Sequence, residues 1–513
     1  MNKRPLILVS LLLAAFAVNL DTTIVNVALP TLVRELHASN SDLQWVVDAY
    51  NLVFASLILT AGSLSDRVGR KGMLIAGLGV FGAASVAGAL TESAGALIAA
   101  RAVMGLGAAM VFPATLSVIS NVFTERSDRA RAIGLWGATA GIAIALGPIF
   151  GGWLLGSYSW SSIFYAMAPV ALLGALLVAR YVPSSRDPQA PPLDLRGFAL
   201  STAGMAALVF TIIQAPEYGW GSTRTVGGFV LATALLVGFI VSQLRSRTPM
   251  LDIGLFGNPR FSTASAAVTV SFFTLLGFIF VMTQYFQFIK RYDALSAGVH
   301  LLPVALSVGG ASVLGTKLAV RFGTKLVVAT GLVMVTAFYI WVSAIVSPDT
   351  SYAIIAIQMV LYGTGMGLTS APATEAIMGA VSRTKAGVGS AVNDATRLLG
   401  GTLGVAVIGS VYATIYSGHL DSTLPGGLPR SVSELAHSSV GGALGAAEQL
   451  ARAGHPALAG GLQHAASDAF IKGLSAGCLV AAGVAAAGAL MAVILLPAQP
   501  AEMPALAVAG DAG

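Results

Sequence analysis

The chain has 513 residues, of which 56% are hydrophobic and only 10% are charged, with a formal net charge of +6. A soluble domain carries about 25% charged residues, and a mean hydropathy of +0.82 leaves too few polar side chains to coat a water-exposed surface. The composition therefore excludes a soluble enzyme and indicates an all-α integral membrane protein, while the single cysteine, Cys478, excludes an intramolecular disulfide.

Fourteen apolar segments are each long enough to cross about 30 Å of hydrocarbon, which takes roughly 20 helical residues. In chain order these predicted spans 1–14 are 5–29, 43–63, 73–91, 95–119, 131–156, 162–182, 196–215, 225–244, 262–288, 297–317, 325–346, 352–378, 388–416 and 469–496. The first resembles a signal peptide in its basic flank, but its apolar run is too long and contains Asp21. We therefore interpret it as a membrane helix.

The Lys and Arg residues predict the orientation of these spans. With the N-terminus in the cytoplasm, nineteen of them fall in inner segments, spread over every inner loop, and six fall in outer segments. Positive residues favour the cytoplasmic side, so this bias predicts that both termini are cytoplasmic and supports the count of fourteen. The +6 net charge is explained by these loops and does not indicate a nucleic-acid partner.

Two long segments are predicted to lie outside the membrane. A Pro-rich cytoplasmic linker begins at residue 183, after span 6, and a Gly- and Ala-rich outer loop occupies residues 418–467. The apolar spacing between Glu434 and Leu450 permits a short amphipathic helix in that loop, although a loop with little order fits the sequence equally well. Residues 498–513 are predicted to form a cytoplasmic tail.

An internal repeat suggests how the spans are grouped. The segment Gly62–Lys71 and the segment Thr316–Lys325 share Arg, Gly and Lys at a fixed offset of 254 residues, although Val320 replaces Asp66. Each segment joins the second and third helices of a six-helix block. We therefore predict an N-terminal bundle (1–182), a linker with two inserted helices (183–260), a C-terminal bundle (261–497) and a tail (498–513), with a substrate site between the bundles.

Four motifs at these positions resemble those of one transporter family. The loop Gly62–Lys71 resembles the cytoplasmic signature of the major facilitator superfamily, and Arg101–Gly107 resembles the fourth-helix motif of its proton-linked members. The glycines from Gly141 to Gly152 resemble the fifth-helix motif of antiporters. The segment Leu20–Pro30 is similar to the first-helix motif of the fourteen-helix drug:proton antiporter branch, the EmrB/QacA type.

Together, the residues and the resemblance imply a proton-coupled multidrug exporter of lipophilic, cationic compounds that works by alternating access. Its expected setting is the bacterial inner (plasma) membrane, and its expected partners are a small-molecule substrate, protons and the lipid bilayer. We expect a monomer without cofactor, metal or nucleic acid. A narrow exporter of one endogenous metabolite, antibiotic, peptide or lipid remains the alternative.

Three ionisable residues lie in the outer halves of spans 1, 2 and 4, where each costs at least about 2.5–3.5 kcal/mol to insert. They are Asp21, Asp48 and Arg101, and we expect them to meet in one cavity. Desolvation favours a neutral carboxyl whereas a nearby arginine favours the carboxylate, so moving an acid relative to Arg101 would change its proton affinity. We predict a proton-coupling role with Asp48 as the main carrier; a static buried ion pair is the alternative.

Further charges lie toward the inner side. Glu375 follows Pro372 in span 12 and is predicted to be a second substrate or proton carboxylate. Asp394 and Arg397 are three residues apart on one face of span 13, which predicts either an inner gate or a local intrahelical pair. The loop residues predicted to latch one conformation are Asp66, Arg67 and Arg70. Topology marking by Arg70 and Lys71 is the alternative.

Small and aromatic residues complete the predicted site. Span 5 contains small residues that allow close helix packing, which would oppose a proton leak between the bundles: Gly137, Gly141, Gly147, Gly151 and Gly152. Aromatic rings can bind lipophilic cations through cation–π contacts. The residues predicted to bind substrate are Trp45, Tyr50, Trp136, Phe273, Tyr285, Tyr362 and Glu375.

Other classes of protein find little support. The sequence has no Gly-rich lysine loop for nucleotides, no cluster of metal ligands and no nucleophile–base motif, so we expect no enzyme activity. A sensor that does not transport would need a soluble output domain, and no segment is long and polar enough to form one.

Overall fold

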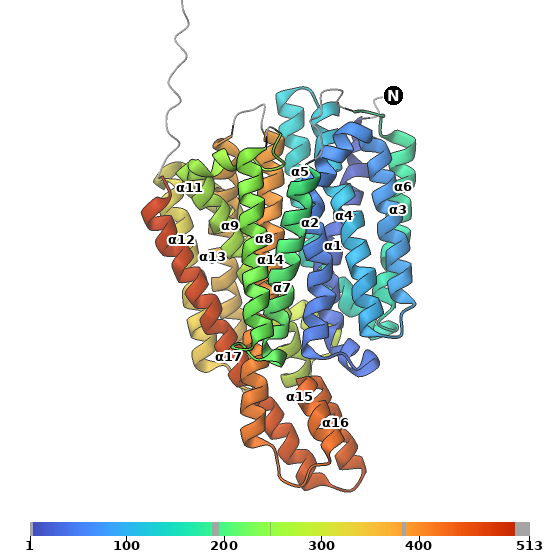
Figure 1. The fold of residues 1–513 in the computed structure, drawn as a ribbon, viewed down its shortest axis with the longest axis vertical. Helices are drawn as coiled ribbons and strands as arrows, with labels where there is room; N and C mark the ends of the chain where they lie inside the picture. The colour runs from blue at the N-terminus through green and yellow to red at the C-terminus, as the bar shows by residue number, and fades with distance from the viewer. Residues whose placement is uncertain (1–3, 187–193, 247, 382–385, 498–513) are drawn as a thin grey trace, which may run out of the picture.

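The computed structural model describes residues 4–186, 194–246, 248–381 and 386–497, and within these ranges all regular structure is helical. Long helices run along one axis and form a bundle, with the N-terminus at one end and a helical projection at the other (Figure 1). The long helices are α1 (Arg4–Leu36), α2 (Asn40–Val68), α3 (Arg70–Ala89), α4 (Ala94–Val122), α5 (Arg126–Ser157), α6 (Ser162–Tyr181), α7 (Leu195–Tyr218), α8 (Thr223–Arg245), α9 (Pro259–Gln284), α11 (Leu302–Phe322), α12 (Thr324–Ile345), α13 (Tyr352–Gly379), α14 (Ala386–Thr423) and α17 (Pro456–Leu495).

Each predicted span coincides with one of these helices, with α10 (Ala294–His300) and η2 (Tyr285–Ile289) completing two of them. Within the described ranges, twelve helical segments are long and apolar enough to cross a membrane, and a thirteenth is α2 if its two parts, bent by 54°, form one span. Helix α5 is 32 residues long but is not among these segments, and many of its side chains lie outside the described residues. The structure thus confirms a multi-span helical membrane protein.

The internal repeat has a direct structural counterpart at two glycines. Gly69 ends α2 and precedes α3, and Gly323, 254 residues later, ends α11 and precedes α12. Both have positive φ, 123° and 87°, which strongly favours glycine. The backbone N–H of Gly69 donates to Ser65, and that of Gly323 donates to Ala319, so the same helix ending occurs twice.

Close helix contacts also repeat between the two predicted bundles. A Cβ atom on Gly107 of α4 would lie 2.7 Å from the carbonyl oxygen of Gly77 in α3, and one on Gly365 of α13 would lie 2.6 Å from that of Gly331 in α12. Gly77 and Gly331 are again 254 residues apart. We call α1–α6 the N-terminal bundle and α9–α14 with α17 the C-terminal bundle.

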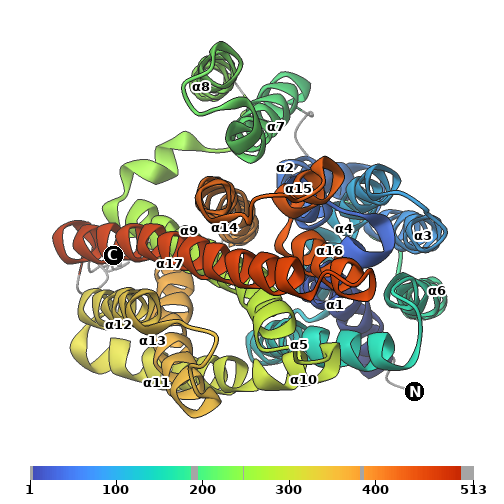
Figure 2. The ribbon, with the colours of Figure 1, turned by 90° about the horizontal axis from the view of Figure 1, so that it is seen from below.

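Helices α7 and α8 stand at the side of the bundles, with α7 next to α2 and α14 and α8 outermost (Figure 2). The hydroxyl of Ser410 in α14 donates to the carbonyl of Ile212 in α7 at 2.7 Å, and the indole N–H of Trp220, after α7, donates to Thr414 at 3.0 Å. Helix α7 therefore covers the line along which α2 of one bundle meets α14 of the other.

Residues 418–467, which we call the cap, are helical and not a loop with little order. The ends of α14 and α17 project beyond the bundle and carry α15 (Arg430–Ser438) and α16 (Val440–Arg452) between them (Figure 1). The predicted amphipathic helix near Glu434 to Leu450 is present as these two helices, separated at Ser439. Helix α16 buries Ala443, Ala446 and other small residues, which is why it packs closely and does not extend into solvent.

The two bundles touch each other toward the cap end. The side-chain amide of Gln287 in η2 donates to the carbonyl of Val27 in α1 at 2.9 Å. A Cβ on Gly152 of α5 would lie 2.4 Å from the carbonyl oxygen of Ala294 in α10, so these backbones are in direct contact. The side chains of Ser410 and Gln44 join α14 to α2 at 3.3 Å. The described structure is therefore closed at the cap end.

Candidate functional site

A fully buried ion pair joins α1 to α4 inside the N-terminal bundle. The Arg101 guanidinium donates through Nη1 to Asp21 Oδ2, and both side chains are inaccessible to solvent. Arg101 Nε donates to the carbonyl of Val46 in α2 at 2.9 Å, and the guanidinium lies 4.4 Å from the ring centre of Tyr50. One arginine therefore connects three helices of this bundle.

Close helix packing around the pair explains why the arginine stays inside. A Cβ on Gly105, one turn after Arg101, would lie 2.5 Å from the carbonyl oxygen of Tyr50, so only glycine lets α4 approach α2 here. The Tyr50 hydroxyl donates to Val18 in α1 at 3.0 Å. Asp21 Oδ1 and Arg101 Nη2 have no hydrogen-bond partner among the described residues. A buried pair with unused donor and acceptor atoms can exchange partners when helices move.

Asp48 does not join this pair, contrary to the expectation of a single cluster. It is fully buried, and neither carboxylate oxygen has a hydrogen-bond partner within the described ranges. Its helix face explains the separation: Gln44, four residues earlier, faces α14 and accepts from Ser410, whereas Val46 and Tyr50 face Arg101. Asp48 therefore lies on the face of α2 that turns toward the C-terminal bundle.

Sequence reasoning did not single out two uncharged polar residues on this face of α2. Gln44 bonds across to α14, and Asn51, three residues after Asp48, is fully buried with no partner for its amide in the described structure. The signal was present in the sequence as amide side chains inside an apolar span. Only charged and aromatic residues stood out in this span, so both amides were missed.

The inner charges lie in different surroundings from those expected. Glu375 is exposed on α13, so it is not the buried carboxylate of a substrate cavity in this structure. Asp394 is buried and lies 3.5 Å from the amide of Asn393. Arg397 donates to Thr374 of α13 at 3.1 Å and lies 5.3 Å from the ring centre of Phe272 in α9. Arg397 thus connects neighbouring helices, and no ion pair within 4.0 Å joins it to Asp394 in the described structure.

The loop between α2 and α3 contains an ion pair, Arg70 Nε to Asp66 Oδ1, at 2.8 Å. Both residues are partly exposed, whereas Arg67 is exposed. The backbone N–H of Arg70 donates to the carbonyl of Ser185 at 3.0 Å, which ties this loop to the start of the linker after α6. Most of that linker lies outside the described residues.

The predicted substrate aromatics do not line one pocket. Trp45 faces Phe210 of α7, with ring centres 6.1 Å apart, and the Trp136 indole donates to Thr115 inside the N-terminal bundle at 3.0 Å. Phe273, Tyr285 and Tyr362 are all buried in the C-terminal bundle. Since these rings lie in different bundles and, in the described structure, do not line one cavity, a shared substrate site would require the bundles to move.

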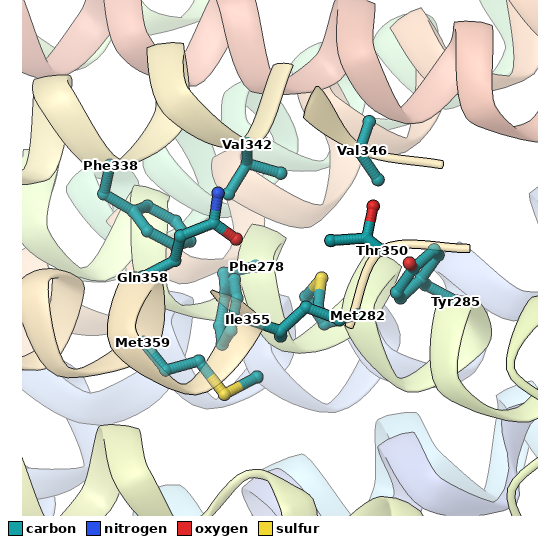
Figure 3. Close-up of a pocket in the computed structure, with 10 residues that line it drawn as sticks. All are labelled: Phe278, Met282, Tyr285, Phe338, Val342, Val346, Thr350, Ile355, Gln358 and Met359. Atoms are coloured by element: carbon teal, nitrogen blue, oxygen red, sulfur yellow. The ribbon is translucent and has the colours of Figure 1, made fainter. Parts of the chain in front are cut away.

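The C-terminal bundle contains a small cavity, shown in Figure 3. It offers about 10 Å³ to the centre of a water molecule, which is room for one water and not for a drug. Its lining comprises Phe278, Met282, Tyr285, Phe338, Val342, Val346, Thr350, Ile355, Gln358 and Met359. The Gln358 amide nitrogen is buried without a partner in the described structure, and flexible Met282 and Met359 form adaptable walls. Within the described residues no group of three or more His, Cys, Asp or Glu could hold a metal ion.

The glycines of α5 bring backbones together both within and between the bundles. A Cβ on Gly151 would lie 2.8 Å from the side chain of Ile24 in α1, and Gly152 contacts α10 as described above. Among the other glycines predicted for this packing, the surroundings of Gly137 and Gly141 lie outside the described side chains. The close contact at Gly152 provides a test of closure at the cap end.

We expect Gly152→Val to prevent the closed arrangement, because its side chain would overlap the backbone of Ala294 and Leu295. Gly156→Val, one turn later where a Cβ meets nothing within 4 Å, is the matched control. Export should fall at least about tenfold for the first variant, equivalent to about 1.4 kcal/mol, and stay near wild type for the second. Equal export by both variants would show that the contact does not matter.

Comparisons with known proteins agree with this architecture. Residues 11–405 match the profile of the family described as Major Facilitator Superfamily. The chain is 35% identical over 433 residues to "Multidrug resistance protein Stp" of Mycobacterium tuberculosis, covering 84% of this chain and 80% of Stp. It is 34% identical over 479 residues to "Multidrug efflux pump LfrA" of Mycolicibacterium smegmatis, covering 93% and 94% of the two chains.

A third relative is the "Tetracenomycin C resistance and export protein" of Streptomyces glaucescens, which is 30% identical over 504 residues and covers 96% of this chain and 92% of its own length. Among solved structures, a bacterial homologue of the human lysosomal transporter Spinster superposes with a TM-score of 0.67 at 16% identity, covering 98% of this chain and all of that one. This last likeness concerns the fold alone.

Proposed function

The chain belongs to the Major Facilitator Superfamily, and on this basis we propose that it is a proton-coupled exporter of multiple lipophilic, cationic compounds. Relatives that are 30–35% identical are named multidrug or antibiotic resistance and export proteins, which supports export of drugs or antibiotics. The proposed cycle is alternating access, in which the two bundles open a shared site first to one side of the membrane and then to the other.

The observation that carries proton coupling is the buried pair of Asp21 and Arg101, with its unused carboxylate oxygen and guanidinium nitrogen. A charge inside a membrane protein is costly and marks a functional site unless it is fully satisfied. In our proposal Asp48, on the face of α2 toward α14, is the main proton carrier, and Asp21 assists it by exchanging Arg101 for a proton when the bundles rearrange.

Substrate charge is the second element of the proposal. Within the described structure neither carboxylate oxygen of Asp48 has a donor, and a lipophilic cation near the meeting line of the bundles would be a suitable partner for it. Aromatic rings and methionines around the site would adapt to varied shapes. The aromatic residues singled out from the sequence would act only when the bundles open, since several are now in separate clusters. Glu375 would provide a carboxylate on the inner side, where the substrate enters from the cytoplasm.

The transport assay that tests this proposal uses inverted vesicles with an imposed pH gradient and a panel of cationic, neutral and anionic compounds. We expect the gradient to drive uptake of several lipophilic cations, with weak uptake of anions. Uptake at a rate that does not depend on the pH gradient would contradict proton coupling. Uptake of one compound only would favour the narrow alternative below.

We further propose that all fourteen long helices cross the membrane and that both termini lie in the cytoplasm of a bacterial plasma-membrane protein that acts as a monomer. Helix α5 supports this count because, after the charged turn at its start, it carries no charged residue from Ala132 to Ser157. Its close contacts with α1 place it inside the bundle. If α5 did not cross the membrane, every loop after it would lie on the opposite side of the membrane.

Cysteine labelling tests this topology directly. In a Cys478→Ser background, we expect an impermeant reagent on intact cells to label Glu448→Cys in the cap and not Ser184→Cys after α6, since both positions are exposed. Permeabilised cells should show both labels, which controls for reactivity. Labelling of position 184 but not 448 in intact cells would reverse the orientation.

A narrower exporter is the second candidate. Relatives named for resistance to tetracenomycin C and methylenomycin A, two of them from Streptomyces species, favour export of one antibiotic made by the cell itself. The two proposals share the coupling machinery and differ in the substrate range, which the compound panel above measures.

A further inference from the structure

The cap contains two histidine–aspartate pairs that the proposed export cycle does not use. His419 Nε2 lies 2.5 Å from Asp468 Oδ2 and joins α14 to α17. His437 Nε2 lies 2.6 Å from Asp421 Oδ1 and joins α15 to α14. The first pair connects two long helices that are already packed along the bundle. The second attaches the hairpin of α15 and α16 to the rest of the protein.

The surroundings of His437 fit its protonated form. Its Nδ1 lies 2.7 Å from the carbonyl oxygen of Ser433, and its Nε2 faces the Asp421 carboxylate. A carbonyl and a carboxylate can only accept, so both ring nitrogens must carry a proton to make both bonds. Partial burial opposes the charge, but the bonds to Ser433 and Asp421 and the charge of Asp421 outweigh it and raise the pKa of His437 above its usual 6.5.

The hairpin that His437 attaches lies across both bundles. A Cβ on Gly441 of α16 would lie 2.7 Å from the side chain of Val33 in α1 and 2.7 Å from that of Phe288 in η2, so α16 touches the last turns of both elements. Tyr416 of α14 donates to Ala436 at the end of α15 at 2.9 Å. Seen from the cap end, α15 and α16 overlie the N-terminal bundle, although they are attached through α14 and α17 (Figure 2).

We propose that protonated His437 clamps the hairpin of α15 and α16 over the junction of α1 and η2, so that acid on the outer side holds the cap end closed and loss of this proton releases the hairpin. The bundles cannot separate at this end unless α16 leaves either Val33 or Phe288. The proposal rests on alternating access, and it adds a control by outer pH at a site remote from Asp21 and Arg101.

The charges around His437 determine the direction of this control. Asp421 of α14 is the acid that faces it, Arg430 and Glu434 on its own helix pair with each other at 3.0 Å, and Asp468 of α17 is engaged by His419. Because the contact of the docked hairpin with Asp421 raises the pKa of His437, protonation stabilises docking of the hairpin. This stabilisation is complete below the usual histidine pKa of about 6.5 and is lost as the pH rises through the raised value.

The test measures the cap position without any transport. Spin labels at Glu35→Cys on α1 and Glu448→Cys on α16, both exposed, report the distance between the cap and the N-terminal bundle in purified Cys478→Ser protein. Between about pH 5 and about pH 9, we expect one short-distance population at acid pH and a longer one that grows as the pH rises. His437→Gln and Asp421→Asn should show the longer population throughout.

His419→Gln is the matched control, because it removes a similar pair in the same cap that does not attach the hairpin. It should keep the pH response. A pH response that survives in His437→Gln, or none in the wild-type distances, would overturn the clamp. The distance measurement needs no substrate, so the two proposals can fail separately. A failed export assay with a normal pH response of the distance would reject the proposed function and keep the clamp. Normal export without a pH response of the distance would reject the clamp and keep the proposed function.

Discussion

Replacing Arg101 with alanine is expected to abolish uphill export driven by a pH gradient. The substitution leaves Asp21 buried without its cation, and removing one partner of a buried pair costs about 3–5 kcal/mol unless the other becomes neutral. Asp21 would then keep its proton through the cycle, and protons and substrate would no longer exchange. The measurement is substrate uptake into inverted vesicles under an imposed pH gradient, with substrate binding measured in parallel.

Two further variants separate coupling from simple support of the fold. Arg101→Lys should restore uptake only in part, because a lysine lacks the planar fork that serves Asp21 and Val46 at once. The double variant Asp21→Asn with Arg101→Gln should recover thermal stability without recovering uphill export. If the double variant exports as well as the wild type, the pair is a static structural link and carries no proton.

Asp48→Asn is expected to abolish the release of protons that accompanies binding of a cationic substrate. Asparagine keeps the shape of the side chain but cannot titrate, so a bound cation has no proton to displace from this position. Uphill export of cations should be lost, while binding of neutral ligands persists. Proton release from detergent-purified protein on addition of a cationic dye is the direct measurement.

Asp42→Asn is a matched control for this experiment. Asp42 is an acid of the same helix, but it caps the start of α2 together with Ser39. Loss of the Asp42 carboxylate should lower the stability of the protein by about 0.5–2 kcal/mol and leave proton release unchanged. Full release from Asp48→Asn would assign the proton elsewhere, with Asp21 and then Glu375 as the next candidates.

The proton count follows from the same two acids. Exchange of one proton for one monovalent cation moves no net charge across the membrane and depends on the pH gradient alone. If Asp21 and Asp48 both titrate, the cycle moves one net charge and gains roughly 2.3 kcal/mol from a potential of about 100 mV. A response of uptake to membrane potential at zero pH gradient therefore distinguishes one acid from two.

Much of the architecture was determined by the sequence itself. A membrane span must satisfy its backbone internally and be apolar over some 20 residues, so the helices could be located from composition alone. The repeat from Gly69 to Gly323 predicted two related blocks, because a turn that needs positive φ leaves a glycine at the same place in each. Buried charges such as Asp21 and Arg101 stood out because apolar spans contain so few.

Only the tertiary structure decided which of these residues meet. Helix periodicity fixes the direction of a side chain relative to its own helix but not the rotation of that helix against its neighbours. Asp48 therefore could not be separated from Arg101 in advance, nor could Trp45 be assigned to α7. The helices of the cap lie beyond the predicted spans, in a Gly- and Ala-rich segment whose order comes from packing on α1, η2 and α17. Contacts such as Gly441 against Val33 join residues far apart in the chain, and that of His437 with Asp421 joins two helices across a turn, so neither leaves a local pattern in the sequence.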